Sequence, residues 1–477
     1  MRTNRMTAIL AVALGVGLVW LASASPTLAA KRPHPTKLSY PSLGLTTPQA
    51  TDIALSNGLA GFLIEDHEIP VVDVVVLVKT YFPERERYGL NAMAQWVIRN
   101  GGTATWPGDK LNDELEFLAA NVEVYGGDLS TIFAFNCMKK DLPRVLDIFA
   151  DLIMNPAFPE DKVEMRRNTM LEEIRRRNDD PGTVSRREFS QLIYGDHPYG
   201  WETTPESVKG LTRDDLVGFY NAYFHPNNAV IGISGDVTRD EIVAALEKAL
   251  AAWRPADVTV PTVPELAAPA APTCNYAYMD ISQAYISMGH EGINLNDPDR
   301  CAVNIMNFIL GGGSFTSWIT EEVRSDEGLA YSANSRYTAD PWAKGLFTAS
   351  AQTKADACGR AITILQEQLK RMCGPGPTEK EVERAVDTYV NSQVFDYESK
   401  AQVVRRLVEL RYQGRPLDSP ERDIETYRKL TVADIKSAAR KYLRPDNLTL
   451  LVVGNKELFD RPLSEFGPVN EIRLDKE

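Results

Sequence analysis

Residues 89–103 read GLNAMAQWVIRNGGT and predict the helix around which the rest of the chain is organised. Apolar residues recur there at i, i+3, i+4, i+7 and i+8, which gives a helix one buried face: Leu90, Met93, Ala94, Val97 and Ile98. An Asn-Gly-Gly sequence then predicts where the helix ends. The opposite face carries Ala92, Gln95 and Trp96. Since this spacing stacks side chains on one side of a helix, we expect the three to converge on a single point.

The first 30 residues predict a secretory signal peptide. Arg2 and Arg5 precede an apolar run over residues 8–22, and small residues follow over 23–30. The run is shorter than the roughly 20 residues that span a membrane. No cysteine follows it as a point of lipid attachment. We therefore expect a mature chain that is periplasmic or secreted and is not held by a membrane.

Composition and charge restrict the partners of the mature chain. The 477 residues are 44% hydrophobic and 25% charged, as in soluble globular proteins of more than one domain. Without residues 1–30 the chain has 50 basic and 65 acidic side chains, a net charge of −15. That excess of acid argues against nucleic acid and anionic membranes as partners. The five cysteines lack C-x-x-C spacing, so no metal cluster is expected, although one bridge between Cys358 and Cys373 stays open.

Further elements of the first half follow from periodicity and turn signals. Gly126 and Gly127 stand between two strand-like runs and predict the turn of a β-hairpin. The predicted strands are residues 61–67, 71–79, 122–125, 129–137 and 229–234. The predicted helices are residues 111–120, 142–154, 159–178, 186–194, 213–223 and 239–253.

The second half of the chain repeats the first. LTRDDLVGFYNAYFHPNNAVIGISGDV, from Leu211, matches LTVADIKSAARKYLRPDNLTLLVVGNK, from Leu430, at an offset of 219 residues. A helix, a Pro-Asn turn and a buried strand occur twice in the same order, which predicts a duplicated α+β unit. The predicted organisation is a signal peptide (1–30), an extended lead-in (31–50), an N-terminal domain (51–254), a Pro- and Ala-rich linker (255–273) and a C-terminal domain (274–477).

The organising helix resembles the zinc helix of the pitrilysin/insulinase family of metallopeptidases. In that family it reads G-x-x-H-x-x-E-H and runs on into a Gly-Thr pair; the two histidines bind zinc and the glutamate is the general base. The corresponding positions here are Ala92, Gln95 and Trp96. Alanine has no lone pair, an indole only donates, and an amide takes no proton near neutral pH. The resemblance therefore implies a peptidase scaffold without its chemistry, with no zinc and no catalytic residue on this chain.

The resemblance extends over about residues 54–455, nearly all of the mature chain. It implies an α+β fold class, in which two homologous α/β-sandwich domains form half of a clamshell chamber. This expectation agrees with the duplicated unit derived from the repeat.

Glu173 corresponds to the third zinc ligand of the family, a glutamate in an E-E-I segment about 77 residues beyond the second histidine. It lies in RRNTMLEEIRRRNDDP, 77 residues beyond Trp96. Zinc sites need three or four ligands, so Glu173 alone is a relic position, and an active enzyme that uses it with other ligands is the least favoured interpretation. The alternative, a solvated helix face, predicts i,i+4 pairs of Glu172 with Arg176 and of Glu173 with Arg177.

Arg324 and Tyr331 resemble a second element of the family. Their segment, EEVRSDEGLAYS, is similar to R-x-x-x-G-L-A-Y-S of the family's second domain, where the Arg and Tyr reach towards the substrate backbone near the zinc site. Guanidinium and phenol groups suit peptide carbonyls and developing oxyanions. Gly328, between them, predicts the end of a helix. The resemblance implies that the pair binds substrate, whereas without it the two are ordinary surface residues.

The remaining candidates predict structural roles. The five histidines include no pair spaced for joint ligation, and His197 and His225 each precede a proline in motifs that the family carries without ligand roles. Residues 302–310 predict a helix, equivalent to the organising helix, that ends at the glycines 311–313. These glycines predict a tight turn; a glycine-rich substrate loop is the alternative, and a phosphate loop is excluded because no Lys-Ser/Thr follows.

Two functions are compatible with these features. In the first, the chain is the non-catalytic, substrate-binding subunit of a heterodimeric zinc metallopeptidase of the processing-peptidase type. It would bind unstructured peptides by strand addition and supply Arg324 and Tyr331 to a zinc-bearing paralogous partner, as in family members that divide these parts between two subunits. In the second, the chain is an inert structural or peptide-binding scaffold. The sequence leaves open which peptides are cut, and whether a zinc-bearing partner exists or the chain is a homodimer.

Overall fold

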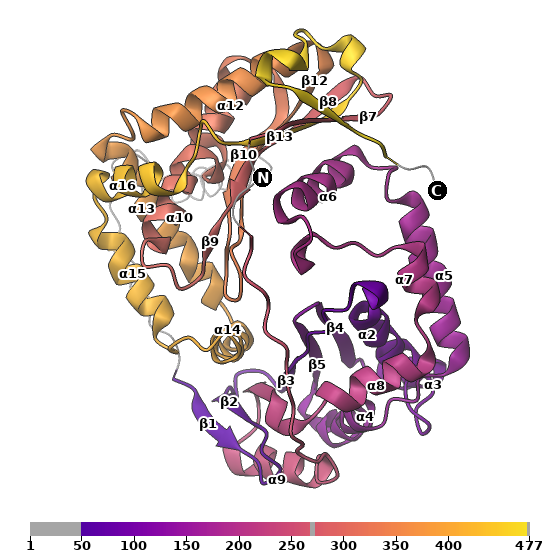
Figure 1. Ribbon diagram of the computed structural model, residues 1–477. Coiled ribbons are helices and arrows are strands. Elements are labelled where there is room, and N and C mark those ends of the chain that lie inside the picture. Colours follow the sequence, from indigo (N-terminus) through magenta and orange to yellow (C-terminus); the bar gives the residue numbers. More distant parts are fainter. Residues whose placement is uncertain (1–48, 268–271, 475–477) are drawn as a thin grey trace, which may run out of the picture. The chain divides into compact units, whose positions relative to one another are not determined.

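The computed structural model describes residues 49–267 and 272–474, except for the side chains of Ser325, Asp326 and Tyr331. Two six-stranded sheets carry most of the strands, one from each half of the chain (Figure 1). The predicted signal peptide and almost all of the lead-in lie outside the described residues. Within those residues, no helix combines the length and the apolar character needed to cross a membrane.

The first sheet has the strand order β1-β2-β6-β3-β5-β4. Successive side chains of its strand β3 point alternately to the two faces of the sheet, which lie in different environments. Val72, Val74 and Val76 are buried in the core of the first half, whereas Asp73 and Val75 lie on the other face. β4 is an edge strand. The strands are β1 (Thr51–Ala54), β2 (Ala60–Glu65), β3 (Val71–Lys79), β4 (Asn121–Gly127), β5 (Ser130–Met138) and β6 (Ala229–Gly235).

The organising helix is α2 (Leu90–Gly101), and its predicted apolar face is buried. It begins after Gly89 (φ 104°) and ends before Gly102 (φ 67°), two backbone conformations that favour glycine. The predicted buried residues are each at most 2% exposed: Leu90, Met93, Ala94, Val97 and Ile98. The other helices of this half are α3 (Gly108–Phe117), α4 (Leu142–Met154), α5 (Glu160–Arg176), α6 (Pro181–Tyr194), α7 (Pro205–Gly210), α8 (Arg213–Tyr223) and α9 (Arg239–Ala249).

The second half repeats this arrangement, so the predicted duplicated α+β fold is confirmed. Its sheet runs β14-β7-β13-β8-β12-β10, which gives each strand the place of its counterpart in the first sheet. The outer strand differs, since β1 is antiparallel and β14 parallel to its neighbour. The strands are β7 (Cys274–Tyr278), β8 (Gln283–Glu291), β9 (Ile293–Asn294), β10 (Ala330–Tyr337), β11 (Ala339–Asp340), β12 (Leu346–Lys354), β13 (Thr449–Gly454) and β14 (Val469–Ile472).

The helices of the second half carry the same repeat. α8 and α16 begin and end 219 residues apart, the offset found in the sequence. Between α9 and β7, the described residues contain no helix or strand; the domain boundaries themselves stay a prediction. The helices are α10 (Arg300–Asn307), α11 (Trp318–Thr320), α12 (Cys358–Cys373), α13 (Glu379–Ser392), α14 (Lys400–Tyr412), α15 (Ser419–Lys429) and α16 (Val432–Tyr442).

Each half places one helix on the sheet of the other half. α14 packs on the first sheet beside Gly232, where an added side chain would collide with Val404 and Val408. α6 packs on the second sheet, and its Val184 and Phe189 are buried in a cluster with residues of β7 and β13. This exchange buries apolar surface from both halves and therefore couples their stability.

The turn of the β4–β5 hairpin lies two residues later in the sequence than predicted. Gly126 and Gly127 belong to β4, and Asp128 and Leu129 form the turn. A Cβ at Gly126 would collide with the carbonyl oxygen of Ser130. This glycine therefore serves the close approach of two backbones rather than the turn itself.

The glycine run of the second half does not form the predicted tight turn. Gly311 and Gly312 continue α10 as a π-helical turn, and the positive φ, 54°, falls on Ser314. A Cβ at Gly311 would collide with the backbone nitrogen of Ser335 in β10. Glycine is needed there because helix and strand approach closely.

Cys358 and Cys373 do not form the bridge that the sequence leaves open. They are the first and last residues of α12. At 1.5 Å per residue their Cα atoms lie about 22 Å apart, whereas a disulfide requires about 7 Å or less. All five cysteines are free.

Candidate functional site

Ala92, Gln95 and Trp96 lie beside the free edge of the first sheet. All three line one pocket of about 480 Å³, which we call the motif pocket, together with residues of β4. Arg99 holds α2 against this edge, because its Nε donates to the carbonyl oxygen of Val122 at 2.5 Å. The helical spacing thus brings the three motif positions to one place.

The side chain of Gln95 has a structural role, because its hydrogen bonds join α2 to the β4–β5 hairpin. It is 7% exposed, and its amide nitrogen donates into the β4–β5 hairpin. The acceptors within reach are Asn91 Oδ1 at 3.0 Å, Ser130 O and Thr131 Oγ1 at 3.2 Å, and Gly127 O at 3.3 Å. An amide with this role neither takes up a proton nor activates a water molecule.

Glu173 forms an ion pair with Arg166, whose Nη1 lies 2.8 Å from Glu173 Oε1. The predicted pair of Glu173 with Arg177 is therefore wrong, and so is that of Glu172 with Arg176, because Glu172 pairs with Arg175 at 2.8 Å. Arg166 also lines the motif pocket. Arg166 thus contacts the relic carboxylate and lines the pocket of the other motif positions, whereas Glu173 itself lines a different pocket.

The residues at this place do not fit a zinc ion. Ala92 offers no donor atom, Trp96 offers only an N–H, and Glu173 is already neutralised by Arg166. Throughout residues 49–267 and 272–474, no three His, Cys, Asp or Glu side chains gather closely enough to hold a metal.

We expect the purified chain to contain no stoichiometric zinc, because two of the three ligand positions hold Ala92 and Trp96. The double change Ala92→His with Trp96→His should give only weak zinc uptake, since Arg166 still competes for Glu173. Adding Arg166→Gln should strengthen the uptake. Elemental analysis after gel filtration measures both effects. About one tightly held zinc per wild-type chain would contradict this expectation.

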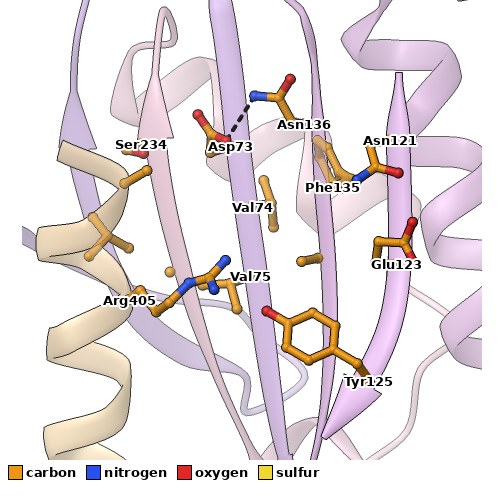
Figure 2. A pocket seen from close by; sticks show the side chains of 14 residues that line it. Asp73, Val74, Val75, Asn121, Glu123, Tyr125, Phe135, Asn136, Ser234 and Arg405 are labelled. Carbon is orange, nitrogen blue, oxygen red and sulfur yellow. Dashed lines mark hydrogen bonds between the residues drawn. The ribbon is translucent and has the colours of Figure 1, made fainter. Parts of the chain in front are cut away.

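A second pocket, of about 180 Å³, lies on the open face of the first sheet. Figure 2 shows Arg405 of α14 on one side of it and Glu123 and Tyr125 of β4 on the other. Between them Asp73 accepts a hydrogen bond from Asn136 Nδ2 at 2.8 Å. Glu123 and Tyr125 also line the motif pocket, so the two pockets adjoin the same edge strand.

β4 is the outer strand of the first sheet, and the carbonyl oxygen of its Val122 already accepts from Arg99. An edge strand presents backbone N–H and C=O groups that another extended chain can pair with. Side chains of a strand added there would point alternately towards the open sheet face and towards α2. The two pockets would thus receive side chains of one extended peptide.

Arg324 and Tyr331 lie in different elements of the second half. Arg324 is exposed in a π-helical turn, Glu321–Asp326, and its guanidinium carbon lies 4.7 Å from the centre of the Phe315 ring. Gly328 has a φ of 64°, which ends that turn as predicted. Tyr331 lies in β10 where the pairing with β12 shifts register, and its side chain is outside the described residues. Phe315 was missed by sequence reasoning; its place two residues beyond Gly313, the last residue of the glycine run, was the available signal.

The two histidines singled out in the sequence have backbone partners. Nε2 of His197 lies 2.9 Å from the carbonyl oxygen of Pro264, and its Nδ1 accepts from Tyr199 N, which fixes the tautomer. The ring nitrogens of His225 lie near the carbonyl oxygens of Asn221 and Arg254. Both contacts agree with the predicted structural roles.

Together, the duplicated α+β fold and the degenerate helix motif define a peptidase-type scaffold in which the described residues contain no metal-binding set. The chain belongs to the insulinase family (peptidase family M16): the model "Insulinase (Peptidase family M16)" matches residues 90–204, and "Peptidase M16 inactive domain" matches residues 210–389.

Proteins related to this chain in sequence are described as uncharacterized zinc proteases. The protein of Streptomyces coelicolor is 28% identical over 353 residues, which cover 71% of this chain and 76% of that protein. The protein of Rickettsia bellii is 24% identical over 414 residues, which cover 85% of this chain and 97% of that protein.

Solved structures share the fold. A "peptidase M16 inactive domain" from Pseudomonas fluorescens has a TM-score of 0.77 at 23% identity, covering 87% of this chain and 100% of that one. A protease from Helicobacter pylori has a TM-score of 0.75 at 19% identity, covering 86% and 100%. The periplasmic protease PqqL of Escherichia coli has a TM-score of 0.70 at 16% identity, and 87% of this chain covers 49% of that chain.

Proposed function

We propose that this chain is the non-catalytic, substrate-binding subunit of a two-chain zinc metallopeptidase of the processing-peptidase type. The observation that carries the proposal is the motif pocket: the zinc positions hold Ala92, Trp96 and an ion-paired Glu173, while β4 beside the pocket is the outer strand of its sheet. Zinc and its general base would be carried by a paralogous partner.

The proposed partner is a second chain with an intact zinc motif. The alignment with this chain covers 49% of PqqL, so one PqqL polypeptide is long enough for two such units. We place the complex in the periplasm, on the basis of the predicted signal peptide and of the compartment named for PqqL.

The proposed peptide site is the edge of β4. An unstructured peptide would pair with this edge and place alternate side chains beside Glu123 and Tyr125. Arg324 and Tyr331 would donate to the peptide backbone at the partner's zinc site. The stacking of Arg324 on Phe315 favours this role, because it restrains an otherwise flexible guanidinium group.

An inert scaffold is the second candidate. It is favoured by the way in which Gln95 and Arg166 are engaged inside the chain, as expected where only structure is maintained. The two candidates differ in whether this chain changes the rate at which a partner cleaves peptides.

The test is reconstitution. A tagged mature chain is purified from its own organism, the co-purifying proteins are identified, and any zinc-bearing paralogue is produced alone. We expect the paralogue to cleave an unstructured peptide slowly by itself and at least tenfold faster with this chain. A stable complex whose rate equals that of the paralogue alone would support the scaffold instead. Absence of any paralogue in the purified complex would contradict the proposal.

A further inference from the structure

Two arginines line the motif pocket, although the protein as a whole is acidic, with a formal net charge of −13. Two guanidinium groups line it, Arg99 and Arg166, against one carboxylate, Glu123. They come from different helices, α2 and α5, and meet where the family binds its metal. Arg166 also pairs with Glu173, so the two cations are balanced by two carboxylates, and an anionic ligand would be held by guanidinium donors that lack an acceptor in the described residues.

Arg166 has hydrogen-bonding capacity left over. Its Nη1 donates to Glu173, whereas its Nε is buried and has no partner within the described residues. The side chain is 15% exposed, so water satisfies little of it. Nε and Nη2 together form the side of a guanidinium fork, which matches the two oxygens of a carboxylate.

Arg99 is fixed beside it. Nε of Arg99 donates to the carbonyl oxygen of Val122, and Nη1 donates to Asn112 Oδ1 at 2.9 Å. These two bonds hold its guanidinium at the edge strand and leave Nη2 without a protein acceptor in the described part of the chain. The pocket therefore combines Arg99, whose guanidinium group is held in place, with Arg166, whose guanidinium group has donors without an acceptor in the described residues.

We propose that the motif pocket binds a carboxylate of the peptide that lies along β4, with Arg166 as the principal ligand and Arg99 as the second. The inference rests on the proposed peptide binding and adds a substrate class to it: peptides with a free C-terminus or an acidic side chain at this position. The positive group that replaces zinc thus becomes a recognition element. The C-terminal carboxylate and the acidic side chain share this chemistry and are separated by the experiment.

The experiment measures binding of fluorescein-labelled, unstructured peptides to the full mature chain by anisotropy. Four peptides of one sequence are compared: a free C-terminus or an amide, each with a central Glu or Gln. Arg166→Gln is the test variant, and Arg175→Gln is the matched control, because Arg175 lies on the same helix and also pairs with a glutamate. Arg166→Lys keeps the charge and loses the fork, and it serves as the test variant if Arg166→Gln does not fold.

We expect Arg166→Gln to weaken binding of the preferred carboxylate peptide about 10- to 100-fold, as for loss of a charge-assisted bidentate bond, and to leave its neutral counterpart unchanged. Arg166→Lys should lose most of that preference, and Arg175→Gln none. If affinity falls when the C-terminus is amidated, the bound carboxylate is that of the C-terminus. If affinity falls when the central Glu is replaced by Gln, the bound carboxylate is that of the side chain.

Equal affinity of all four peptides for the wild-type chain would overturn this inference and leave the proposed peptide binding intact. So would equal behaviour of the Arg166 and Arg175 variants. If no peptide binds at all, the proposed function fails together with it.

Discussion

Arg324→Ala should slow cleavage of an unstructured peptide by the reconstituted two-chain enzyme by about 10²–10³-fold. That is the usual effect of removing a donor aimed at a developing oxyanion; a donor that only positions the peptide contributes less. Folding and assembly should be unaffected. Arg324 is exposed, and its contact in the described residues is the stacking on Phe315, which is itself 62% exposed.

Two further variants separate charge from geometry. Arg324→Lys keeps the charge but loses the planar fork, so an equally large loss would implicate the fork. Tyr331→Phe removes only the phenol donor and should also slow cleavage. Arg371→Ala is the matched control, because Arg371 likewise stacks on an aromatic ring, that of Trp318 at 3.7 Å. Wild-type rates for Arg324→Ala and Tyr331→Phe in an intact complex would leave the scaffold function as the better account.

Acid should destabilise the protein through His290. Burial, together with the nearby Arg444 guanidinium, lowers the pKa of His290 from its ordinary value near 6.5 to about 4. The ring lies 5.0 Å from that of Phe347, Nδ1 is 2.7 Å from the carbonyl oxygen of Glu291, and the buried Nε2 has no partner among the described residues. The unpaired nitrogen explains why an added proton is not accommodated.

The direction of this pH effect on stability follows from the difference in proton uptake between the folded and the unfolded chain. Below pH 6.5 the unfolded chain binds a proton at His290 that the folded chain does not bind until about pH 4. The free energy of unfolding should therefore fall as the pH is lowered through this window, by about 3 kcal/mol from this residue. His290→Phe should remove that part of the pH dependence, as measured by urea unfolding at several pH values between 4 and 7.

Other groups also titrate in this range, so the comparison is between variants. The wild type, unfolded in urea at the same pH values, is the reference. If His290→Phe and the wild type lose stability equally on acidification, the buried ring is not the cause.

The sequence by itself determined those features that depend on local spacing. The buried face of α2 follows from a 3.6-residue period, since side chains three and four residues apart share one side of a helix whatever surrounds it. The duplicated fold follows from a 219-residue offset that α8 and α16 keep residue for residue. The loss of zinc ligands follows from residue type alone, because Ala92 and Trp96 have no atom that binds a cation.

Only the tertiary structure decided which partners those residues have. Glu173 could pair with an arginine one turn along α5, but it pairs with Arg166, seven residues back, where Arg166 also lines the motif pocket. The separation of Cys358 from Cys373 and the backbone approach at Gly311 likewise depend on neighbouring elements. The same holds for the exchange of α6 and α14 between the two sheets. The physical reason is that spacing along a chain fixes directions within one element, whereas contacts between elements depend on how their surfaces pack together.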